Sequence, residues 1–441
     1  MVASLQIGPT TTVSATPTTA ESTTTSSSSS TSTSTSTSTS TSTSTSTSTT
    51  STTTLAPAPP GFLDVVRTSL ADPRFESAIV GLSVWVEGVG MVVNHNADAP
   101  MRPGSNEKLL VAWGAYGVLG PGATLDTEVR AEGVVDGSTL RGDLVLVGGG
   151  DPSLTSTGRH SLDRLASLVR ASGITEVTGE LVADDSRFDS SRRAPGWTDR
   201  HVPLFVGPPS ALAVDGNWVR TDPEYVANPA FGNLGVFRAA LSRYGVTLAG
   251  GERMGQASEA APVVGTLHSA PVADLVRYML TNSDNFYAEM LLKEVGRQAR
   301  GLGTFENGVA AVRELAAGAG VTLTGRAADG SGLSRDNTRP AHEWVELLVA
   351  ARDQPWFDQL FNGLPWAGRT GTLSNRFLGT PGEANVRAKT GSVREARALS
   401  GYLTTATGRQ VVFSLVVNGT LPAAVIPAMD SLVSSMAASR I

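Results

Sequence analysis

Cysteine is absent from this chain of 441 residues, and histidine occurs only five times. Without cysteine the protein cannot form disulfides, thiolate nucleophiles or thiolate metal sites, although a cysteine-free chain can work on either side of a membrane. The spacing His-Glu-x-x-His and the Gly-x-Ser-x-Gly elbow are both missing, so neither a metallohydrolase nor a Ser-His-Asp hydrolase is supported. We expect no metal and no cofactor. The isolated histidines are His95, His160, His201, His268 and His342.

Lysine is the second scarce residue type. It occurs only as Lys108, Lys293 and Lys389, and the other 31 of the 34 basic residues are arginine. A chain that uses arginine almost everywhere is expected to keep lysine where arginine would not serve, and the clearest such case is an amine that must lose its proton. The alternative is that lysine is rare through genome composition and that these three residues have no special role. Their neighbours decide between the two interpretations.

The charge balance and the first 60 residues restrict the class of protein further. The formal net charge is -6, so nucleic acid and anionic lipid are not expected as partners. Residues 22–54 are all serine or threonine, and residues 1–60 contain no Lys or Arg and no apolar run of signal-peptide or membrane-spanning length. We expect residues 1–60 to form a disordered Ser/Thr-rich stalk, with a low-complexity tract of no function as the alternative.

Hydrophobic periodicity predicts that both ends of the remaining chain contribute to one sheet. Strands are expected at 79–86, 91–94, 385–389, 398–404 and 410–417, with helices at 64–71, 105–118 and 422–438 and on both sides of a loop at 282–285. This order indicates an α+β fold whose antiparallel five-stranded sheet is flanked by helices. Residues 125–265 follow a different pattern of short strands and turns. We therefore expect one domain formed by 61–124 and 266–441, interrupted by strand-rich inserted domains at 125–265.

Ser105 and Lys108 form a Ser-x-x-Lys motif at the start of a predicted helix, where residues three apart share a face. A serine hydroxyl becomes a good nucleophile when a neighbouring base takes its proton. Lysine can be that base if desolvation and nearby positive charge lower its pKa. Ser-x-x-Lys alone also occurs by chance in many proteins of this size, so the motif needs support from elsewhere in the chain.

Two further motifs lie in a predicted loop and at a predicted strand end. Ser283-Asp284-Asn285 occupies the loop, where residues i and i+2 can point the same way; the alternative is a cap for the helix that follows. Lys389-Thr390-Gly391 ends a strand, and its glycine lets a ligand backbone approach while the lysine and threonine face an anionic group. An ordinary strand end would fit the Lys-Thr-Gly motif as well.

Together and in this order, the three motifs resemble those of penicillin-binding proteins and class A β-lactamases. Ser105 and Ser283 are about 180 residues apart, more than a β-lactamase-like domain needs, and the surplus coincides with the inserted segment. The chain therefore resembles the low-molecular-mass class C penicillin-binding proteins, the D-alanyl-D-alanine carboxypeptidase/endopeptidase family with extra domains inside the catalytic one. Further similarities to that family lie at 142–144, 149–154, 184–186, 195–197, 209–212, 329–334, 371–373 and 399–402.

The resemblance implies a β-lactamase/transpeptidase-like catalytic domain and a serine-type D-Ala-D-Ala carboxypeptidase that works through an acyl-enzyme. Peptidoglycan stem peptides are the implied substrate, with DD-endopeptidase activity on cross-links as a further option, and β-lactam antibiotics are the implied inhibitors. Ser105 would be the nucleophile, Lys108 its base, and Ser283 the relay of a proton to the leaving amine. The implied location is extracytoplasmic, in the cell wall or periplasm, although no export signal and no transmembrane segment is visible.

The other motif residues are implied to bind the substrate. Asn285 would hold the peptide amide of the substrate, and Lys389 with Thr390 would bind its terminal carboxylate. The backbone N–H of Ser392 would form an oxyanion hole together with that of Ser105. The positive charge of the third motif would also help to keep Lys108 neutral. The implied substrate-binding residues are Asn285, Lys389, Thr390, Gly391 and Ser392.

Two departures from the family pattern lie beside the motifs. Glu107 places a carboxylate next to the proposed base, where the family usually has a smaller or less charged residue, unless its side chain faces away on the helix. Residues 393–397 are more charged than the usual apolar or small turn of the family. Both departures concern substrate preference and turnover rather than acylation itself.

Two other interpretations remain open. A β-lactamase or esterase of the same fold would hydrolyse its acyl-enzyme quickly, and a comparison of penicillin turnover with D-alanine release separates it from a carboxypeptidase. A non-catalytic cell-wall binding module would use the inserted segment as its adhesive surface. Such a module would bind peptidoglycan without binding penicillin or releasing D-alanine.

Overall fold

The computed structural model describes residues 57, 61–218, 222–422 and 424–441 of the chain. The stalk predicted for residues 1–60 lies outside these residues except for Pro57. Across the described part of the chain, every helix is too short or too polar to pass through a lipid bilayer.

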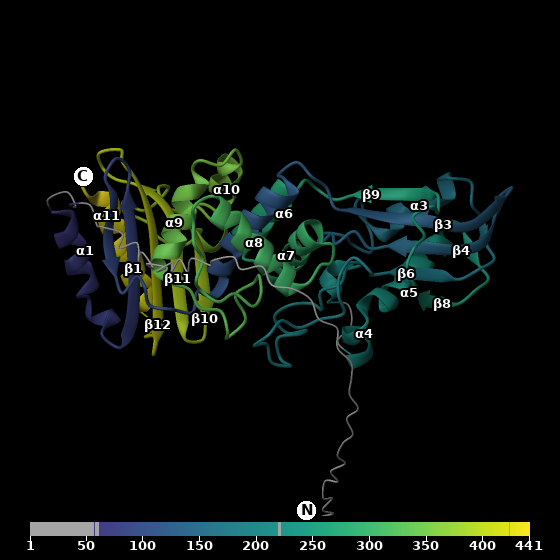
Figure 1. Ribbon diagram of the computed structural model, residues 1–441, viewed down its shortest axis with the longest axis horizontal. Helices are drawn as coiled ribbons and strands as arrows, with labels where there is room; N and C mark the ends of the chain where they lie inside the picture. The colour runs from purple at the N-terminus through teal and green to yellow at the C-terminus, as the bar shows by residue number, and fades with distance from the viewer. Residues whose placement is uncertain (1–56, 58–60, 219–221, 423) are drawn as a thin grey trace, which may run out of the picture. The chain divides into compact units, whose positions relative to one another are not determined.

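Strands from both ends of the described chain form one antiparallel sheet (Figure 1). Its order is β10-β11-β12-β1-β2, and β12 pairs with β1 from Ala78 opposite Gly419 to Val86 opposite Val411. Strands β1 and β12 are rich in valine and buried on both faces, as expected of central strands between two layers of helices. The predicted fold class and its five-stranded sheet are confirmed. The strands are β1 Ala78–Val86, β2 Gly90–His95, β10 Arg387–Val393, β11 Ala396–Thr404 and β12 Gln410–Gly419.

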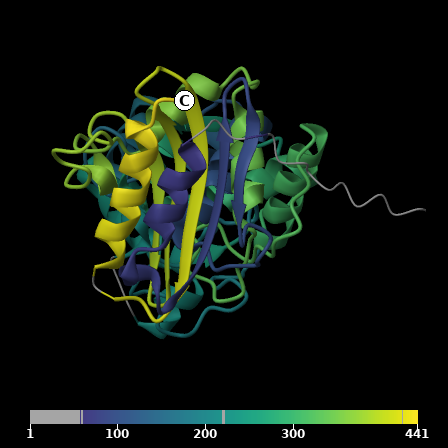
Figure 2. The same cartoon turned by 90° about the vertical axis from the view of Figure 1, so that its left-hand side faces the viewer.

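Helices cover both faces of this sheet. On one face α1 (Phe62–Leu70) packs beside α11 (Val425–Ala438), and Figure 2 shows both in front of the strands. Their apolar side chains share a core with Leu82 and Leu415 of the sheet. On the opposite face a second core joins the sheet to the remaining helices of this layer. These are α2 Lys108–Gly114, α6 Val272–Asn282, α7 Asn285–Arg300, α8 Phe305–Gly318, α9 Ala341–Ala351 and α10 Phe357–Gly363.

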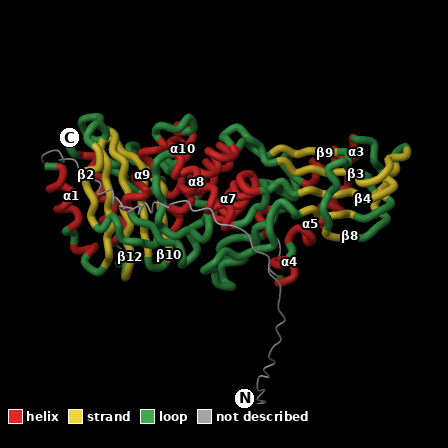
Figure 3. The backbone as a smooth tube through the Cα atoms, in the orientation of Figure 1, coloured by secondary structure: helices red, strands yellow, loops and turns green. Residues whose placement is uncertain are grey.

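A second, seven-stranded sheet comes from the middle of the chain (Figure 3). It is mixed, because β4 is antiparallel to β3 but parallel to β5 and β6. The sheet has its own core, which also includes α3 (Leu162–Ala171) and α5 (Pro229–Arg243), with the short α4 (Pro223–Ala227) before the latter. Its strands are β3 Asp126–Asp136, β4 Thr139–Val147, β5 Glu176–Val177, β6 Leu181–Asp184, β7 Thr247–Leu248, β8 Glu252–Met254 and β9 Val263–His268. The domain boundaries expected at 125 and 265 remain a prediction.

The single helix predicted over 105–118 is divided into three segments. A 3-10 turn at Gly104–Glu107 leads into α2, and a π-helical turn at Ala115–Leu119 ends the segment before Gly120. The 3-10 turn has three residues per turn, so side chains three positions apart eclipse one another more closely than in an α-helix. Further 3-10 turns lie at Pro73–Phe75, Asp215–Asn217 and Gly371–Leu373.

Candidate active site

The 3-10 turn before α2 brings Ser105 and Lys108 into contact. The Nζ atom of Lys108 lies 3.0 Å from Ser105 Oγ. Leu109 and Trp113 of α2 are buried in the helical core, so the pair stands at the end of a firmly packed element. The first two residues predicted for the site are therefore adjacent in the structure.

Lys108 is fully buried, and three oxygen atoms surround its amine. Besides Ser105 Oγ, they are Asn285 Oδ1 at 2.9 Å and Ser331 O at 2.7 Å. Burial lowers the pKa of Lys108 to about 8, although the carboxylate of Glu289 favours the charged amine. In the neutral form, two amine hydrogens suffice for the amide and carbonyl oxygens. The lone pair is then left for the proton of the serine hydroxyl.

The second motif lies in the loop between α6 and α7. Asp284 caps α7 by accepting a hydrogen bond from the backbone N–H of Tyr287 at 2.9 Å, so the helix-cap interpretation is correct for this residue. Ser283 has a left-handed backbone with φ of 58°, and its Oγ accepts a hydrogen bond from Lys389 Nζ at 2.8 Å. Asn285 is the first residue of α7 and faces the amine of Lys108. One loop thus caps the helix and presents two side chains to the site.

Lys389 of β10 is fully buried beside Ser283. Its amine also donates to the carbonyl oxygen of Thr390 at 2.8 Å, and the hydroxyl of Thr390 donates to that of Thr372 at 2.8 Å. Burial lowers the pKa of Lys389 well below its ordinary value, and the charge of Lys108 lowers it further. The sequence suggested that the positive charge of Lys389 would keep Lys108 neutral. In the structure, burial is the largest cause of the lowered pKa of both amines.

The end of β10 passes unusually close to the turn that carries Ser105. A Cβ atom on Gly391 would lie 2.2 Å from Pro103 O. Gly104 has φ of +52°, and a Cβ atom on it would lie 3.1 Å from Ser392 N. Glycine permits both the conformation and the approach. The backbone amide of Ser392 therefore lies beside the turn that carries Ser105, where the predicted oxyanion hole would need it.

The carbonyl of Ser331 is a functional group that sequence reasoning missed. Its orientation toward Lys108 is fixed by Glu289, whose two carboxyl oxygens accept hydrogen bonds from the backbone N–H groups of Gly330 at 2.9 Å and Ser331 at 2.8 Å. Residues 329–334 belonged to the family resemblance, but no pattern tells which carbonyl turns toward the amine. The only available signal for Glu289 was its place one turn after Asn285 on a predicted helix.

A loop that follows β6 orients the amide of Asn285. The Nδ2 group of Asn285 donates to Phe205 O at 2.9 Å, so its Oδ1 atom faces Lys108. No sequence pattern predicts this contact, because it is made by a backbone carbonyl. The inserted segment thus contributes directly to the arrangement around the amine of Lys108.

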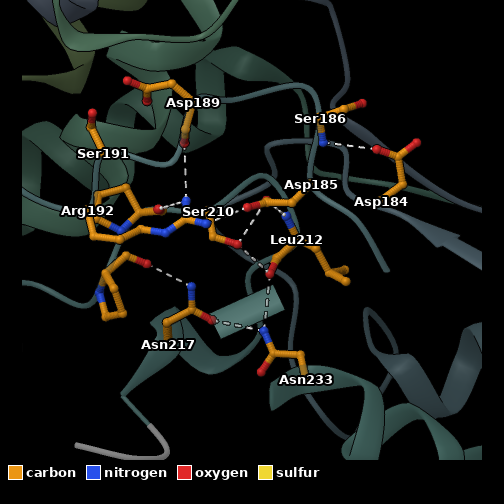
Figure 4. Close-up of polar contacts among 12 residues, drawn as sticks. Asp184, Asp185, Ser186, Asp189, Ser191, Arg192, Ser210, Leu212, Asn217 and Asn233 are labelled. Atoms are coloured by element: carbon orange, nitrogen blue, oxygen red, sulfur yellow. Dashed lines mark hydrogen bonds and ion pairs between the residues drawn. The ribbon is translucent and has the colours of Figure 1, made fainter. Parts of the chain in front are cut away.

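A buried polar network holds this loop in place (Figure 4). Asp185 accepts three hydrogen bonds, from Arg192, Ser210 and Leu212. Lys293 of α7 is fully buried, pairs with Asp189 and donates to Ser191 O at 2.8 Å. The third lysine of the chain therefore ties the loop to the helix that begins with Asn285.

Glu107 lines a small cavity together with Leu110, Val312 and Arg339, and Ser105 is not part of that lining. It is 1% exposed, and within the described chain neither carboxyl oxygen has a hydrogen-bond partner. Arg339 Nε lies 4.0 Å from Oε1, but Arg339 is already bonded to Glu343 at 2.6 Å. Burial raises the pKa of Glu107 to about 8. The carboxyl beside the base is therefore mostly uncharged at neutral pH.

Solved structures share this fold at low sequence identity. Penicillin binding protein 4 (dacB) from Haemophilus influenzae has a TM-score of 0.76 at 21% identity, covering 86% of this chain and 99% of that one. A predatory endopeptidase from Bdellovibrio bacteriovorus has a TM-score of 0.52 at 17% identity, covering 81% of this chain and 92% of that one. These likenesses concern the fold alone.

Sequence comparisons extend the agreement to the family. A D-alanyl-D-alanine carboxypeptidase of Actinomadura sp. (strain R39) is 30% identical over 449 residues, which cover 83% of each chain. Carboxypeptidase DacB of Mycolicibacterium smegmatis is 32% identical over 399 residues, covering 83% of this chain and 82% of the relative. The model of the D-Ala-D-Ala carboxypeptidase 3 (S13) family matches residues 63–229 and 224–439. The chain therefore belongs to this family and is a serine-type D-Ala-D-Ala carboxypeptidase.

Proposed function

We propose that Ser105 attacks the carbonyl carbon of the penultimate D-alanine in a peptidoglycan stem peptide while neutral Lys108 takes its proton. The observation that supports these roles best is the buried amine of Lys108 at 3.0 Å from Ser105 Oγ, with oxygen acceptors at its other two contacts. The bond from Oγ to the carbonyl carbon forms, the amide C–N bond breaks, and an ester acyl-enzyme and free D-alanine result.

The terminal carboxylate of the peptide is assigned to Lys389 and Thr390. Ser283 is bonded to Lys389 and would pass a proton to the leaving nitrogen, so that D-alanine departs as an amine. The N–H groups of Ser105 and Ser392 would stabilise the oxyanion, and loss of one such donor typically costs about 3 kcal/mol of barrier.

Asn285 is assigned to the peptide amide of the substrate. A carboxamide has two N–H groups and two lone pairs on its oxygen, so contacts with Lys108 and Phe205 leave capacity for a ligand. Gly391 is assigned to the close approach of the peptide backbone to β10. Within the protein itself this glycine also admits the turn before Ser105, because a Cβ atom on it would lie 2.2 Å from Pro103 O.

Water completes the reaction by hydrolysing the ester, with Lys108 again as the base. Both oxygens of Glu289 accept backbone hydrogen bonds and burial raises its pKa to about 8, so this carboxyl group is not poised to activate the water. A site without a separate deacylation base should release β-lactams slowly. Slow penicillin turnover together with D-alanine release would favour a carboxypeptidase over a β-lactamase or esterase.

The substrate class also supports a place of action. Family membership supports an extracytoplasmic enzyme, and we propose the cell wall or periplasm. Penicillin binding protein 4 from Haemophilus influenzae, which has the same fold, has been solved in complex with a β-lactam. We accordingly propose β-lactams as inhibitors that acylate Ser105.

Labelling with a fluorescent penicillin tests the nucleophile. Ser105→Ala should take up no label and release no D-alanine from a pentapeptide stem. Ser431→Ala, which changes an exposed serine of α11, is the matched control and should label as the unaltered protein does. Equal labelling of Ser105→Ala and the unaltered protein would show that the nucleophile is another residue.

A further inference from the structure

Asn285, Glu289 and Lys293 lie at intervals of four residues on α7, so their side chains follow one ridge of the helix surface. Asn285 contacts the amine of Lys108 directly. Glu289 holds the backbone of Ser331, whose carbonyl oxygen is another contact of that amine. Lys293 is fully buried one turn further along the helix. Two residues of this ridge therefore arrange the surroundings of Lys108, and the third has no part in the reaction proposed above.

The amine of Lys293 is enclosed by two oxygen acceptors and an aromatic ring. It pairs with the carboxylate of Asp189 and donates to Ser191 O at 2.8 Å, and its Nζ atom lies 4.4 Å from the ring centroid of Phe305. Burial lowers the pKa of Lys293, but the bonded carboxylate opposes that shift. The three oxygens bonded to Lys108, in contrast, are all uncharged. An amine bonded to a carboxylate is suited to holding a segment in place rather than to taking up a proton.

The segment around Asp189 begins a loop whose far end carries Phe205. Arg192 joins the two ends of the loop, because its guanidinium donates to Asp189 O at 3.3 Å and to Pro209 O at 2.7 Å. Phe205 lies four residues before Pro209, and its carbonyl oxygen accepts a hydrogen bond from Asn285 Nδ2 at 2.9 Å. The loop therefore connects the third residue of the α7 ridge to the first.

Apolar packing also holds this loop on α7. Val206, next to Phe205, lies in one apolar cluster with Phe286 and Met290 of the helix. Apolar contacts are non-directional, whereas hydrogen bonds fix the direction of the groups that they join. If apolar packing alone placed the carbonyl of Phe205, loss of Lys293 would lower stability without changing the rate of reaction at each folded site.

We propose that Lys293 is a positioning residue for acylation, because it fixes the loop against α7 and so keeps the carbonyl of Phe205 on the amide of Asn285. That bond keeps the amide oxygen turned toward the amine of Lys108. The inference rests on the proposed function of Ser105 and Lys108. Without the carbonyl, the amide can turn over and present its N–H groups to the amine. These would compete with the serine hydroxyl for the lone pair of the amine, and acylation would slow.

A double-mutant cycle between Lys293 and Asn285 tests the proposal. Lys293→Met keeps most of the length of the side chain and removes its hydrogen bonds. We expect its rate constant for penicillin acylation, expressed per site labelled at saturation, to fall about five- to tenfold, as for the loss of one hydrogen bond. In an Asn285→Ala background the same replacement should change that rate constant less than twofold, because the group that Lys293 positions is gone.

Arg300→Met is the matched control, because it removes a basic residue of the same helix that forms an ion pair with Glu314 at the surface. It should change neither the acylation rate nor the number of labelled sites. Asp189→Asn weakens the contact with Lys293 and serves if Lys293→Met fails to fold. It should slow acylation per labelled site in the same direction, and an unchanged rate would overturn the proposal in that case as well.

Equal losses in the two backgrounds would overturn the proposal, because Lys293 would then act without Asn285. So would fewer labelled sites with an unchanged rate per site, because Lys293 would then serve stability alone. Mapping the labelled residue separates this inference from the proposed function. Label on Ser105 together with equal losses refutes the positioning role and keeps the proposed function. An unaltered protein that takes up no label, or is labelled at another residue, refutes both.

Discussion

Replacement of Glu107 by glutamine tests the electrostatics behind the nucleophile. The charged groups that act on this carboxyl are two arginines and two acids whose charges cancel, so an ionised Glu107 would be a buried anion without a counter-charge of its own. The two arginines are Arg313 of α8 and Arg339, which lies just before α9. The two acids are Glu343, in the first turn of α9, and Asp329, in the loop that contains Ser331. Glutamine keeps the shape of the side chain and removes its proton equilibrium.

The expected effect on stability follows from the two pKa values of the carboxyl. It loses its proton near 4.5 when unfolded and at about 8 when folded. Between these values the folded state holds the extra proton, so each unit of rising pH destabilises it by about 1.4 kcal/mol relative to the unfolded chain. At pH 7 the accumulated cost is about 3 kcal/mol. Glu107→Gln lacks this slope, so its advantage in stability should widen as pH rises.

Urea unfolding at several values between pH 5 and pH 8 measures this slope. The amide adds an offset that does not vary with pH, so the slope rather than the intercept is decisive. Glu306→Gln, at an exposed position in α8, is the control for the replacement itself. If the free energies of unfolding of Glu107→Gln and the unaltered protein differ by a constant amount over this range, Glu107 is not a buried neutral acid.

Changes at three other residues of the site have defined consequences. The rate of penicillin acylation should rise about tenfold from pH 6 to 7 and level off above pH 8, because Lys108 can act as a base only when it is neutral. Normal penicillin labelling of Lys108→Arg would exclude this role for Lys108. Gly104→Ala should lower stability by about 1 kcal/mol or more and slow acylation, because a left-handed alanine is strained and its Cβ crowds Ser392 N; unchanged acylation would contradict the oxyanion assignment. Lys389→Met should raise KM for D-alanine release and move the rise in acylation to higher pH, and an unmoved pH profile would argue against coupled amines.

The sheet and the pairing within each motif could be predicted because they depend on local spacing. Hydrophobic runs near both ends of the chain predicted strands of one antiparallel sheet, and β12 does pair with β1. Three-residue spacing sufficed to predict that Ser105 and Lys108 meet, whether the turn is α-helical or 3-10. The low number of lysines directed attention to the two amines that the structure buries in the site.

The parts that could not be predicted depend on backbone groups and tertiary orientation. Two of the three contacts of the Lys108 amine could not be predicted for this reason. Ser331 contributes its backbone carbonyl, and the amide of Asn285 is oriented by the backbone carbonyl of Phe205. A backbone carbonyl has no sequence signature, because every residue carries one. The direction of Glu107 was equally open, since its helical position allowed either face until the cavity around it was known.

The two buried amines suggest how the terminal carboxylate of a substrate could both bind to Lys389 and activate Lys108 as a base. Burial disfavours charge on Lys108 and on Lys389, and repulsion disfavours charge on both at once. The substrate carboxylate that we propose to bind Lys389 would supply a counter-charge, so the proton would be favoured on that amine. Lys108 then faces a cation, loses its own proton more readily and can accept that of Ser105. A peptide without a free terminal carboxylate would meet a protonated Lys108 more often, and the pH shift expected for Lys389→Met measures this exchange.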